Sequence, residues 1–175
     1  MIHLYTGDGK GKTTAAIGLT VRATGRGKKV IFAQFMKGND TGELHALKLL
    51  EGVRILRSSE NFGFFAQMTG DQKQAITRIH DEILDELLRE AEGGQCDMII
   101  LDEVTYPVKW GLLNARKLKR LLAYGTGNNH KNLELVMTGR DPEPFLSEAA
   151  DYITQMKAVR HPYSRGIPAR EGIEY

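Results

Sequence analysis

The sequence has 175 residues, of which 41% are hydrophobic and 26% are charged. This length and apolar content suit a single domain, 1–175, with a substantial buried core. The formal net charge of +2 comes from 24 Lys and Arg that are mixed with 22 Asp and Glu, which argues against nucleic acid as a partner.

Cysteine content and hydropathy indicate the cellular setting. Cys96 is the only cysteine, which excludes an intramolecular disulfide and suits a reducing cytoplasm. No apolar run approaches the ~20 residues of a membrane span, and no signal peptide precedes the first predicted strand. We therefore expect a cytoplasmic protein without a membrane partner.

The first stretch, 2–14, is an apolar strand that runs into a glycine-rich turn. It matches the phosphate-binding pattern G-x-x-x-x-G-K-[ST] except at the first position, where Thr6 stands and Gly7 takes over the turn. Glycines lack Cβ, so the turn can take positive φ and direct its N–H groups at an anion. The residues expected around the phosphates are Gly7, Asp8, Gly9, Lys10, Gly11, Lys12, Thr13 and Thr14.

Two side chains of this loop have specific roles in the pattern. Lys12 would bring a positive charge to the phosphates, and the Thr13 hydroxyl would ligate a magnesium ion. The helix-compatible run 14–23 would direct its amino terminus at the same anion. A glycine-rich hairpin that binds nothing is the alternative, but the strand and helix context favours the phosphate loop.

The next elements lead back to this loop. Residues 29–35 follow a helix stop at 25–27 and predict a second buried strand. Ligands gather at the carboxyl ends of strands in an open parallel sheet, so we expect 34–38 beside the phosphate loop; an ordinary strand-to-helix loop is the alternative. Residues 41–50 then predict a short helix, and 53–56 a short strand.

The segment 58–70 fits neither the helix nor the strand period, yet it holds three of the six phenylalanines, including Phe62 and Phe64. A loop rich in aromatic residues covers either its own core or a flat ligand. Composition alone leaves both interpretations open.

A long amphipathic helix is predicted from Asp71 to Gly93, because apolar residues recur at spacings of three and four. The strand 97–103 follows and closes on Asp102 and Glu103. In phosphate-loop enzymes such a strand is expected next to the phosphate-loop strand, with an acid that holds or orients magnesium. Many buried strands also end in Asp or Glu without such a role.

The remaining elements continue the alternation of helices and strands. Residues 114–124 predict a helix, and 133–138 a strand that ends before Arg140, which could contact a phosphate or pair with Asp141. Residues 151–159 predict a last strand, followed by a polar tail. The whole pattern predicts an α/β fold of the P-loop NTPase (RecA-like) type: a mostly parallel sheet with helices on both faces.

Several of these stretches together resemble the P-loop-type ATP:corrinoid adenosyltransferases, which make adenosylcobalamin. The matching stretches, in family order, are 6–16, 34–38, 101–106, 138–140, 157–162 and 172–175. The Asp-Glu-x-Thr-Tyr segment and the Gly-Ile-Glu-Tyr ending are more specific than the phosphate loop. Family members usually carry a further segment before the first strand, and their aromatic loop often reads Phe-x-Trp where this chain has Phe62-Gly63-Phe64.

The resemblance implies that a cobalt(I) corrinoid attacks the 5′ carbon of ATP and that triphosphate leaves. ATP and the corrinoid are then substrates, and Mg²⁺ is the cofactor. The implied catalytic residues are Lys12, Thr13 and Glu103, with Thr13, Asp102 and Glu103 around the metal. Arg140 is implied at the nucleotide, and Phe62 and Phe64 at the corrinoid face. Fixed cations and N–H donors would stabilise the charge on the leaving triphosphate, and no general base is needed.

The resemblance also implies a homodimer, with an electron-donating reductase as one candidate source of the reducing electrons. Two other classes stay open: a P-loop ATPase or kinase of other specificity, and a non-catalytic ATP- or corrinoid-binding protein. The products of the reaction separate the three classes.

Overall fold

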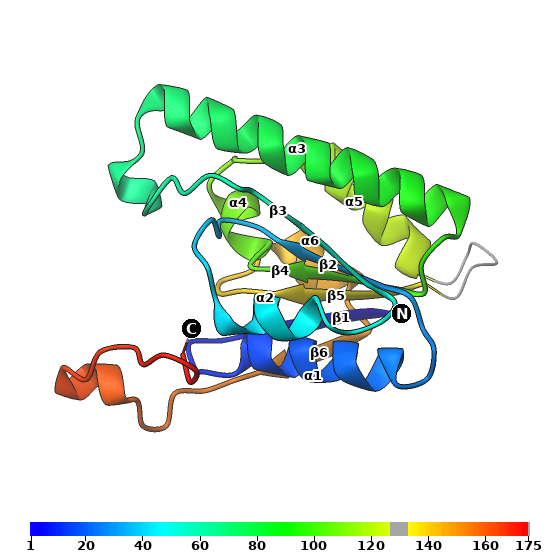
Figure 1. Cartoon of the computed structure of the whole chain (residues 1–175). Helices are drawn as coiled ribbons and strands as arrows, with labels where there is room; N and C mark the ends of the chain where they lie inside the picture. Colours follow the sequence, from blue (N-terminus) through cyan, green and yellow to red (C-terminus); the bar gives the residue numbers. More distant parts are fainter. Residues whose placement is uncertain (127–132, 175) are drawn as a thin grey trace.

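The computed structural model describes residues 1–126 and 133–174; the last residue of the Gly-Ile-Glu-Tyr ending, Tyr175, lies outside this part. A six-stranded sheet in the order β3-β2-β4-β5-β1-β6 forms the centre of the described structure (Figure 1). The neighbouring strands of this sheet all pair in parallel. The strands are β1 (Ile2–Thr6), β2 (Val30–Gln34), β3 (Val53–Arg57), β4 (Met98–Asp102), β5 (Glu134–Thr138) and β6 (Tyr152–Gln155).

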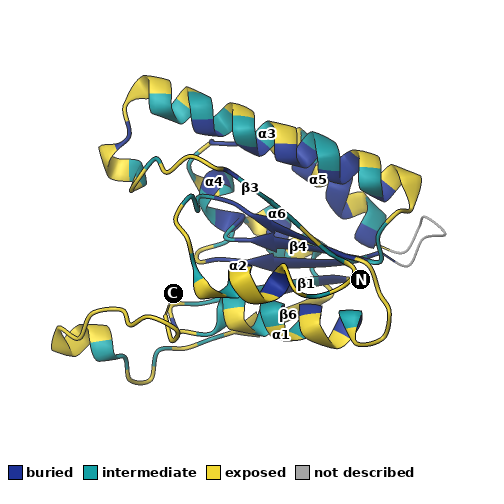
Figure 2. Cartoon of the chain, in the orientation of Figure 1, coloured by how far each residue is buried: buried dark blue, intermediate teal, exposed yellow. Residues whose placement is uncertain are grey.

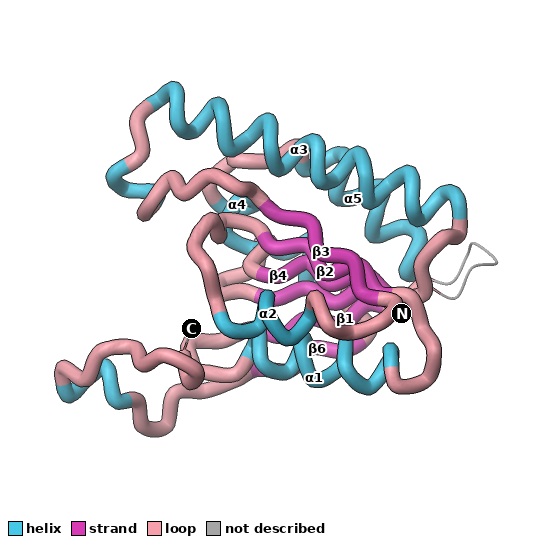
Figure 3. The backbone as a smooth tube through the Cα atoms, viewed as in Figure 1, coloured by secondary structure: helices cyan, strands magenta, loops and turns pink. Residues whose placement is uncertain are grey.

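Helices cover both faces of the sheet (Figure 1). On one face lie α1 (Lys12–Thr24) and α2 (Gly42–Leu47). On the other lie α3 (Gly70–Gly93), α5 (Ala115–Gly125) and α6 (Pro144–Ala149), with the short α4 (Thr105–Lys109) directly after β4. The 3₁₀ turns η1 (Phe65–Gln67) and η2 (Pro162–Arg165) lie in loops (Figure 3). The predicted α/β fold, with helices on both faces of a parallel sheet, is confirmed.

The central strands are buried on both faces (Figure 2). In β2, Val30 and Phe32 point into the core under α1 and α2, whereas Ile31 and Ala33 point into the core under α3 and α5. This alternation follows from the two-residue period of a strand. It explains why these strands appear in the sequence as continuous apolar runs.

The order of the strands corrects one expectation. The strand that ends in Asp102 does not lie next to the phosphate-loop strand, because β5 pairs with β1 on one side and β4 on the other. β5 is itself buried over four of its five residues, and a central place in the sheet provides the cover that this apolar run needs.

Element ends differ from the predictions where local chemistry decides them. α3 starts with a capping box in which Thr69 and Gln72 exchange hydrogen bonds. β6 ends at Gln155, and the remainder of the predicted last strand continues as loop (Figure 3). α4 and α6 are too short for a periodic signal, and each contains a proline.

No helix in the described ranges combines the length and hydropathy needed to cross a membrane.

Candidate functional site

The phosphate loop is held against the segment that follows β6. Gly7 and Gly11 have φ of 98° and 112°. Gly9 does not have a positive φ, but a Cβ there would lie 2.7 Å from the carbonyl O of Met156. The Gly9 N–H donates to this same oxygen at 2.7 Å. The loop therefore needs glycine for its turns at two positions and for close backbone approach at the third.

Helix α1 begins directly after this loop, with Gly11 as its N-cap and no side-chain cap. Its first N–H groups therefore remain available to an anion. The Lys12 ammonium donates to the carbonyl O of Gly7 and of Gly9, both at 2.7 Å. Burial, and then the charge of Arg140, lower the pKa of Lys12. The predicted phosphate lysine thus lies within the loop that it is expected to serve.

Arg140 also contacts this loop. Its Nη2 donates to the carbonyl O of Asp8 at 3.3 Å. Asp141 pairs instead with Lys109 at 3.1 Å. Arg140 therefore lies beside the phosphate loop, and its contact with a phosphate stays a prediction.

Asp102 is fully buried at the end of β4, and four donors occupy its carboxylate. Oδ1 accepts from the hydroxyls of Thr13 at 2.8 Å and Thr138 at 2.7 Å. Oδ2 accepts from Lys37 Nζ at 2.8 Å and Gln34 Nε2 at 3.4 Å. These bonds suit Asp102 for orienting the Thr13 hydroxyl rather than for binding a metal ion directly.

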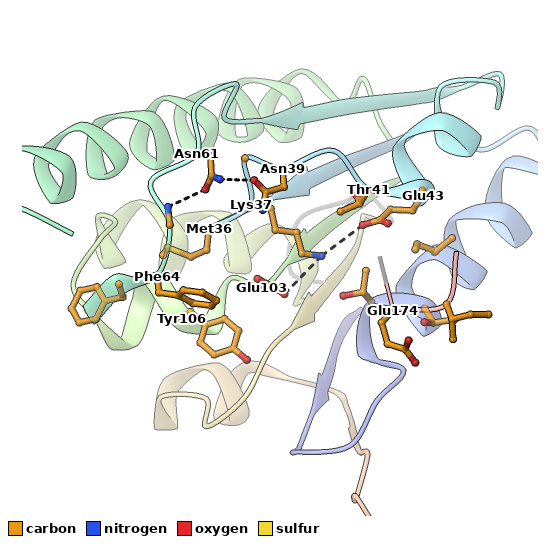
Figure 4. A pocket seen from close by; sticks show the side chains of 18 of the residues that line it. Met36, Lys37, Asn39, Thr41, Glu43, Asn61, Phe64, Glu103, Tyr106 and Glu174 are labelled. Atoms are coloured by element: carbon orange, nitrogen blue, oxygen red, sulfur yellow. Dashed lines mark hydrogen bonds and ion pairs between the residues drawn. The ribbon is translucent and has the colours of Figure 1, made fainter. Parts of the chain in front are cut away.

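Glu103 is arranged differently. Its φ of 61° turns the chain at the end of β4, and its N–H donates to the Thr138 hydroxyl at 2.9 Å. About a third of its side chain is exposed, and Lys37 Nζ is 3.8 Å from Oε1. Burial raises the pKa of Glu103 to about 7, against the opposing charge of Lys37. Its carboxylate faces a cavity that is also lined by Thr13 and Lys37 (Figure 4).

The turn after β2 lies beside the phosphate loop, as predicted for 34–38, because Lys37 and Thr13 bond to the same Asp102. Four polar residues of this network were not assigned a role from the sequence: Gln34, Lys37, Glu43 and Thr138. Lys37 and Thr138 lie at the carboxyl ends of predicted strands, which is a usable signal. Glu43 lies inside a short helix, where the sequence carries no comparable signal.

A cavity of about 1010 Å³ opens over these groups (Figure 4). One part of its wall is polar and includes Thr13, Thr14, Lys37, Glu43 and Glu103. Another part is aromatic and consists of Phe64, Phe65, Tyr106 and Trp110. The polar part lies at the phosphate loop and the aromatic part at the loop before α3.

The two candidate phenylalanines are in different environments. Phe64 is 80% exposed and lines the cavity. Phe62 is partly buried against the small cluster of Met68, Ile76 and Leu112. The two interpretations of the aromatic loop therefore divide between its residues: Phe62 packs on a core, whereas Phe64 is free to contact a ligand.

Three further aromatic residues complete that wall. Phe65 stacks on Trp110 with ring centroids 4.5 Å apart and an interplanar angle of 7°. Trp110 also stacks on Tyr106, at 5.3 Å. The sequence pattern did not indicate this group, because its members come from η1, α4 and the residue after α4, which are separated along the chain.

The carboxy-terminal tail borders the phosphate loop and the cavity. The Ala158 N–H donates to Asp8 Oδ1 at 3.2 Å, and Lys10 lies 3.7 Å from Glu174. Hydrogen bonds from Arg170 lower the pKa of Glu174 to about 2. Ile173 and Glu174 line the cavity. The Gly-Ile-Glu segment of the family-like ending therefore lies at the site, as far as the chain is described.

The oxygen atoms near the phosphate loop can be compared with the ligands that a magnesium ion prefers. In the described ranges, no group of three or more His, Cys, Asp or Glu is arranged to hold a metal ion. Magnesium, however, usually takes one or two carboxylates together with waters and substrate phosphates. The Thr13 hydroxyl donates its proton to Asp102, so its lone pairs are free, and Glu103 adds one accessible carboxylate. These residues fit a magnesium ion that arrives with a nucleotide.

Comparisons with known proteins agree with the motifs. A family model described as "ATP:corrinoid adenosyltransferase BtuR/CobO/CobP" matches residues 1–175. The corrinoid adenosyltransferase of Escherichia coli (strain K12) is 32% identical over 176 residues, covering 100% of this chain and 85% of that protein. The corresponding enzyme of Pseudomonas aeruginosa is 31% identical, with 100% and 83% covered.

Solved structures support the fold at lower similarity. FlaH from Methanocaldococcus jannaschii matches 88% of this chain and 69% of its own, with a TM-score of 0.54 and 14% identity. EssC (ATPases 2 and 3) from Geobacillus thermodenitrificans matches 99% of this chain with the same TM-score and identity, although this chain spans only 36% of it. These two likenesses concern the fold alone. The family model over the whole length and the curated relatives confirm the resemblance indicated by the motifs: the chain belongs to the ATP:corrinoid adenosyltransferase family.

Proposed function

We propose that this protein transfers the 5′-deoxyadenosyl group of ATP to a cobalt(I) corrinoid. A cobalt–carbon bond forms, the bond between C5′ and the α-phosphate oxygen breaks, and its electron pair leaves with inorganic triphosphate. The observation that carries the proposal is a single cavity with a polar end at the phosphate loop and an aromatic end. Its volume of about 1010 Å³ is at the upper end of the ~300–1,000 Å³ range for small-ligand pockets.

At the polar end, the chain supplies groups that stabilise a leaving polyphosphate. Lys12, Arg140 and the first N–H groups of α1 would bind its oxygens. Thr13 and Glu103 would hold Mg²⁺, which supplies positive charge where negative charge develops. Asp102 would fix the Thr13 hydroxyl through the 2.8 Å hydrogen bond. No group needs to activate water, because the nucleophile is the corrinoid cobalt.

At the aromatic end, Phe64 would contact the flat face of the corrin ring, and Phe65, Tyr106 and Trp110 would provide a rigid apolar support. Apolar contact on that face excludes water from the reacting centre. Phe62 would not contact the corrinoid. It would anchor the loop by packing against Met68 and Ile76.

An anaerobic assay tests the proposal. The purified protein is mixed with ATP, Mg²⁺ and chemically reduced cobalamin, and the products are analysed. We expect adenosylcobalamin and triphosphate in equal amounts. ADP with phosphate or a phosphorylated acceptor would instead identify an ATPase or kinase, and the absence of any product would favour a non-catalytic binding protein.

We also propose that residues 1–175 act as one domain, within a cytoplasmic homodimer that receives electrons from a reductase. The family resemblance motivates the dimer and the reductase, and the single cysteine motivates the reducing compartment. Light scattering at several protein concentrations measures the oligomer. Replacing the chemical reductant with a flavin-dependent reductase and a nicotinamide cofactor tests the electron source.

A further inference from the structure

Lys37 lies among three carboxylates, those of Asp102, Glu43 and Glu103, at the polar end of the cavity. Figure 4 shows its contacts with Glu43 and Glu103. Its Nζ lies 2.8 Å from Asp102 Oδ2, 3.7 Å from Glu43 Oε1 and 3.8 Å from Glu103 Oε1. Only the contact with Asp102 is a hydrogen bond. The other two distances leave both glutamates within electrostatic reach but without a direct bond to the ammonium.

The backbone on both sides of Lys37 is fixed. Met36 has a φ of 59°, and its N–H donates to His80 Nε2 at 3.3 Å. His80 is buried, and its Nδ1 is 2.8 Å from the carbonyl O of Leu112. Gly38 lies so close to Glu60 that a Cβ would collide with its carbonyl oxygen. A lysine between two such positions has little freedom at its Cα, so its direction toward Asp102 is set by the fold.

The charges of this group determine what Lys37 can do. Glu103 is only partly ionised near neutral pH, because its pKa is raised to about 7. The three carboxyl groups nevertheless carry more charge than the one ammonium balances, and this excess of negative charge grows if the ammonium is removed. A divalent cation is attracted more strongly to the more negative group, whereas the phosphates of a nucleotide are repelled more strongly. The side chain of Lys37 is 20% exposed and that of Asp102 is not exposed at all, so solvent screens these interactions only in part.

We infer that Lys37 is a positioning residue that acts as a built-in counter-cation. It offsets the negative charge of Asp102, Glu43 and Glu103 and so keeps the affinity of the site for a free divalent ion low until a nucleotide is present, so that the metal enters together with ATP. The inference rests on the proposed function insofar as it concerns the metal of that site. It gives Lys37 a role distinct from that of Lys12, which lies on the phosphate loop.

A purely structural role would have a different signature. If Lys37 only neutralised the buried Asp102, its removal would destabilise the fold and weaken every ligand. The counter-cation role predicts changes of opposite sign: tighter binding of a metal ion alone and weaker binding of ATP. This difference in sign makes the inference testable without measuring turnover.

The test measures Mn²⁺ binding to the full chain in the absence of nucleotide, by electron paramagnetic resonance of the free ion. Lys37→Met removes the charge and keeps much of the side-chain volume, and we expect its Mn²⁺ affinity to rise roughly tenfold or more. Lys37→Arg keeps the charge and should stay within about threefold of the unmodified protein. Lys48→Met is the matched control, because Lys48 is an exposed lysine outside the group, and its Mn²⁺ affinity should not change.

ATP binding is measured on the same variants by calorimetry with Mg²⁺ present, and it should weaken in Lys37→Met only. Equal or weaker Mn²⁺ binding by a folded Lys37→Met protein would overturn the inference. If that variant does not fold, Glu43→Gln carries the test, since it removes one carboxylate while Lys37 and Asp102 stay paired. Its Mn²⁺ binding should weaken, and unchanged affinity would overturn the inference. A failure of the adenosylation assay would not alter either result, so the two proposals fail separately.

Discussion

Alanine at Phe62 and at Phe64 should have opposite consequences, although the two residues are separated by one glycine. Phe64 is 80% exposed, so its removal should change the free energy of unfolding by no more than about 0.5 kcal/mol. Phe62 is partly buried against Met68, Ile76 and Leu112. A fully buried Phe→Ala change costs about 3–5 kcal/mol, so for this partly buried ring we expect a loss of about 1–3 kcal/mol.

The effect on function should be reversed. If the Phe64 ring is covered by the corrin face in the productive complex, its removal forfeits an apolar contact of about 1.5–3 kcal/mol. This corresponds to a decrease of roughly 10- to 150-fold in kcat/KM for the corrinoid. ATP affinity should stay unchanged, because Phe64 lies on the aromatic part of the cavity wall and not at the phosphate loop.

Three measurements on both variants decide the matter: urea unfolding, ATP affinity by calorimetry, and the adenosylation rate at varied corrinoid concentration. Phe65→Leu is a useful control, since it breaks the stacking on Trp110 but leaves an apolar side chain. A Phe64→Ala protein that unfolds more easily, or that adenosylates at the normal rate, would refute the assignment of Phe64 to the corrinoid face.

Three other outcomes follow from the site. Lys12→Ala should lower kcat at least 100-fold, since losing one preorganised donor costs roughly 3 kcal/mol, and normal circular dichroism with normal turnover would contradict this role. Glu103→Gln should raise the Mg²⁺ concentration needed for half-maximal rate, and an unchanged titration at normal activity would exclude Glu103 as the metal carboxylate. Burial lowers the pKa of His80 below its usual 6.5, so the unfolded chain binds more protons than the folded one just below pH 6.5. Stability should therefore fall as the pH drops below about 6.5, by up to about 1.4 kcal/mol per unit, and His80→Gln should reduce this slope in urea unfolding between pH 5.5 and 7.

Much of the fold could be predicted from periodicity. The apolar runs at 29–35 and 97–103 gave their strands to within a residue or two, and the spacing of apolar residues gave α3 nearly from end to end. These signals are local. A strand buried on both faces appears as a continuous apolar run, and a helix buried on one face appears as apolar residues at spacings of three and four.

The order of the strands could not be predicted in the same way. β2, β4 and β5 are all apolar and all buried, so their composition does not say which of them is next to β1. That choice depends on the packing of helices far away in the sequence. The general rule for phosphate-loop enzymes pointed to β4, and the pairing of β5 with both β1 and β4 shows that it was wrong here.

The aromatic loop shows the same limit on a smaller scale. The family resemblance implied the same place, at the corrinoid face, for Phe62 and Phe64. The segment is irregular, with Gly63 at a φ of 69° between the two rings. One ring consequently packs on Met68 and Ile76 while the other faces the cavity.

Asp102 and Glu103 illustrate why residue type alone does not assign roles at the end of a strand. Both are carboxylates and adjacent, yet Asp102 is inside the protein with four donors and Glu103 faces the cavity. The separation arises because Glu103 takes a φ of 61°, which costs about 1–3 kcal/mol for a residue other than glycine. A hydrogen bond from its N–H to Thr138, which itself bonds to Asp102, holds it there. The same hydroxyl thus fixes the inner carboxylate and the turn that presents the outer one, which lets the two acids serve the proposed magnesium site from different sides.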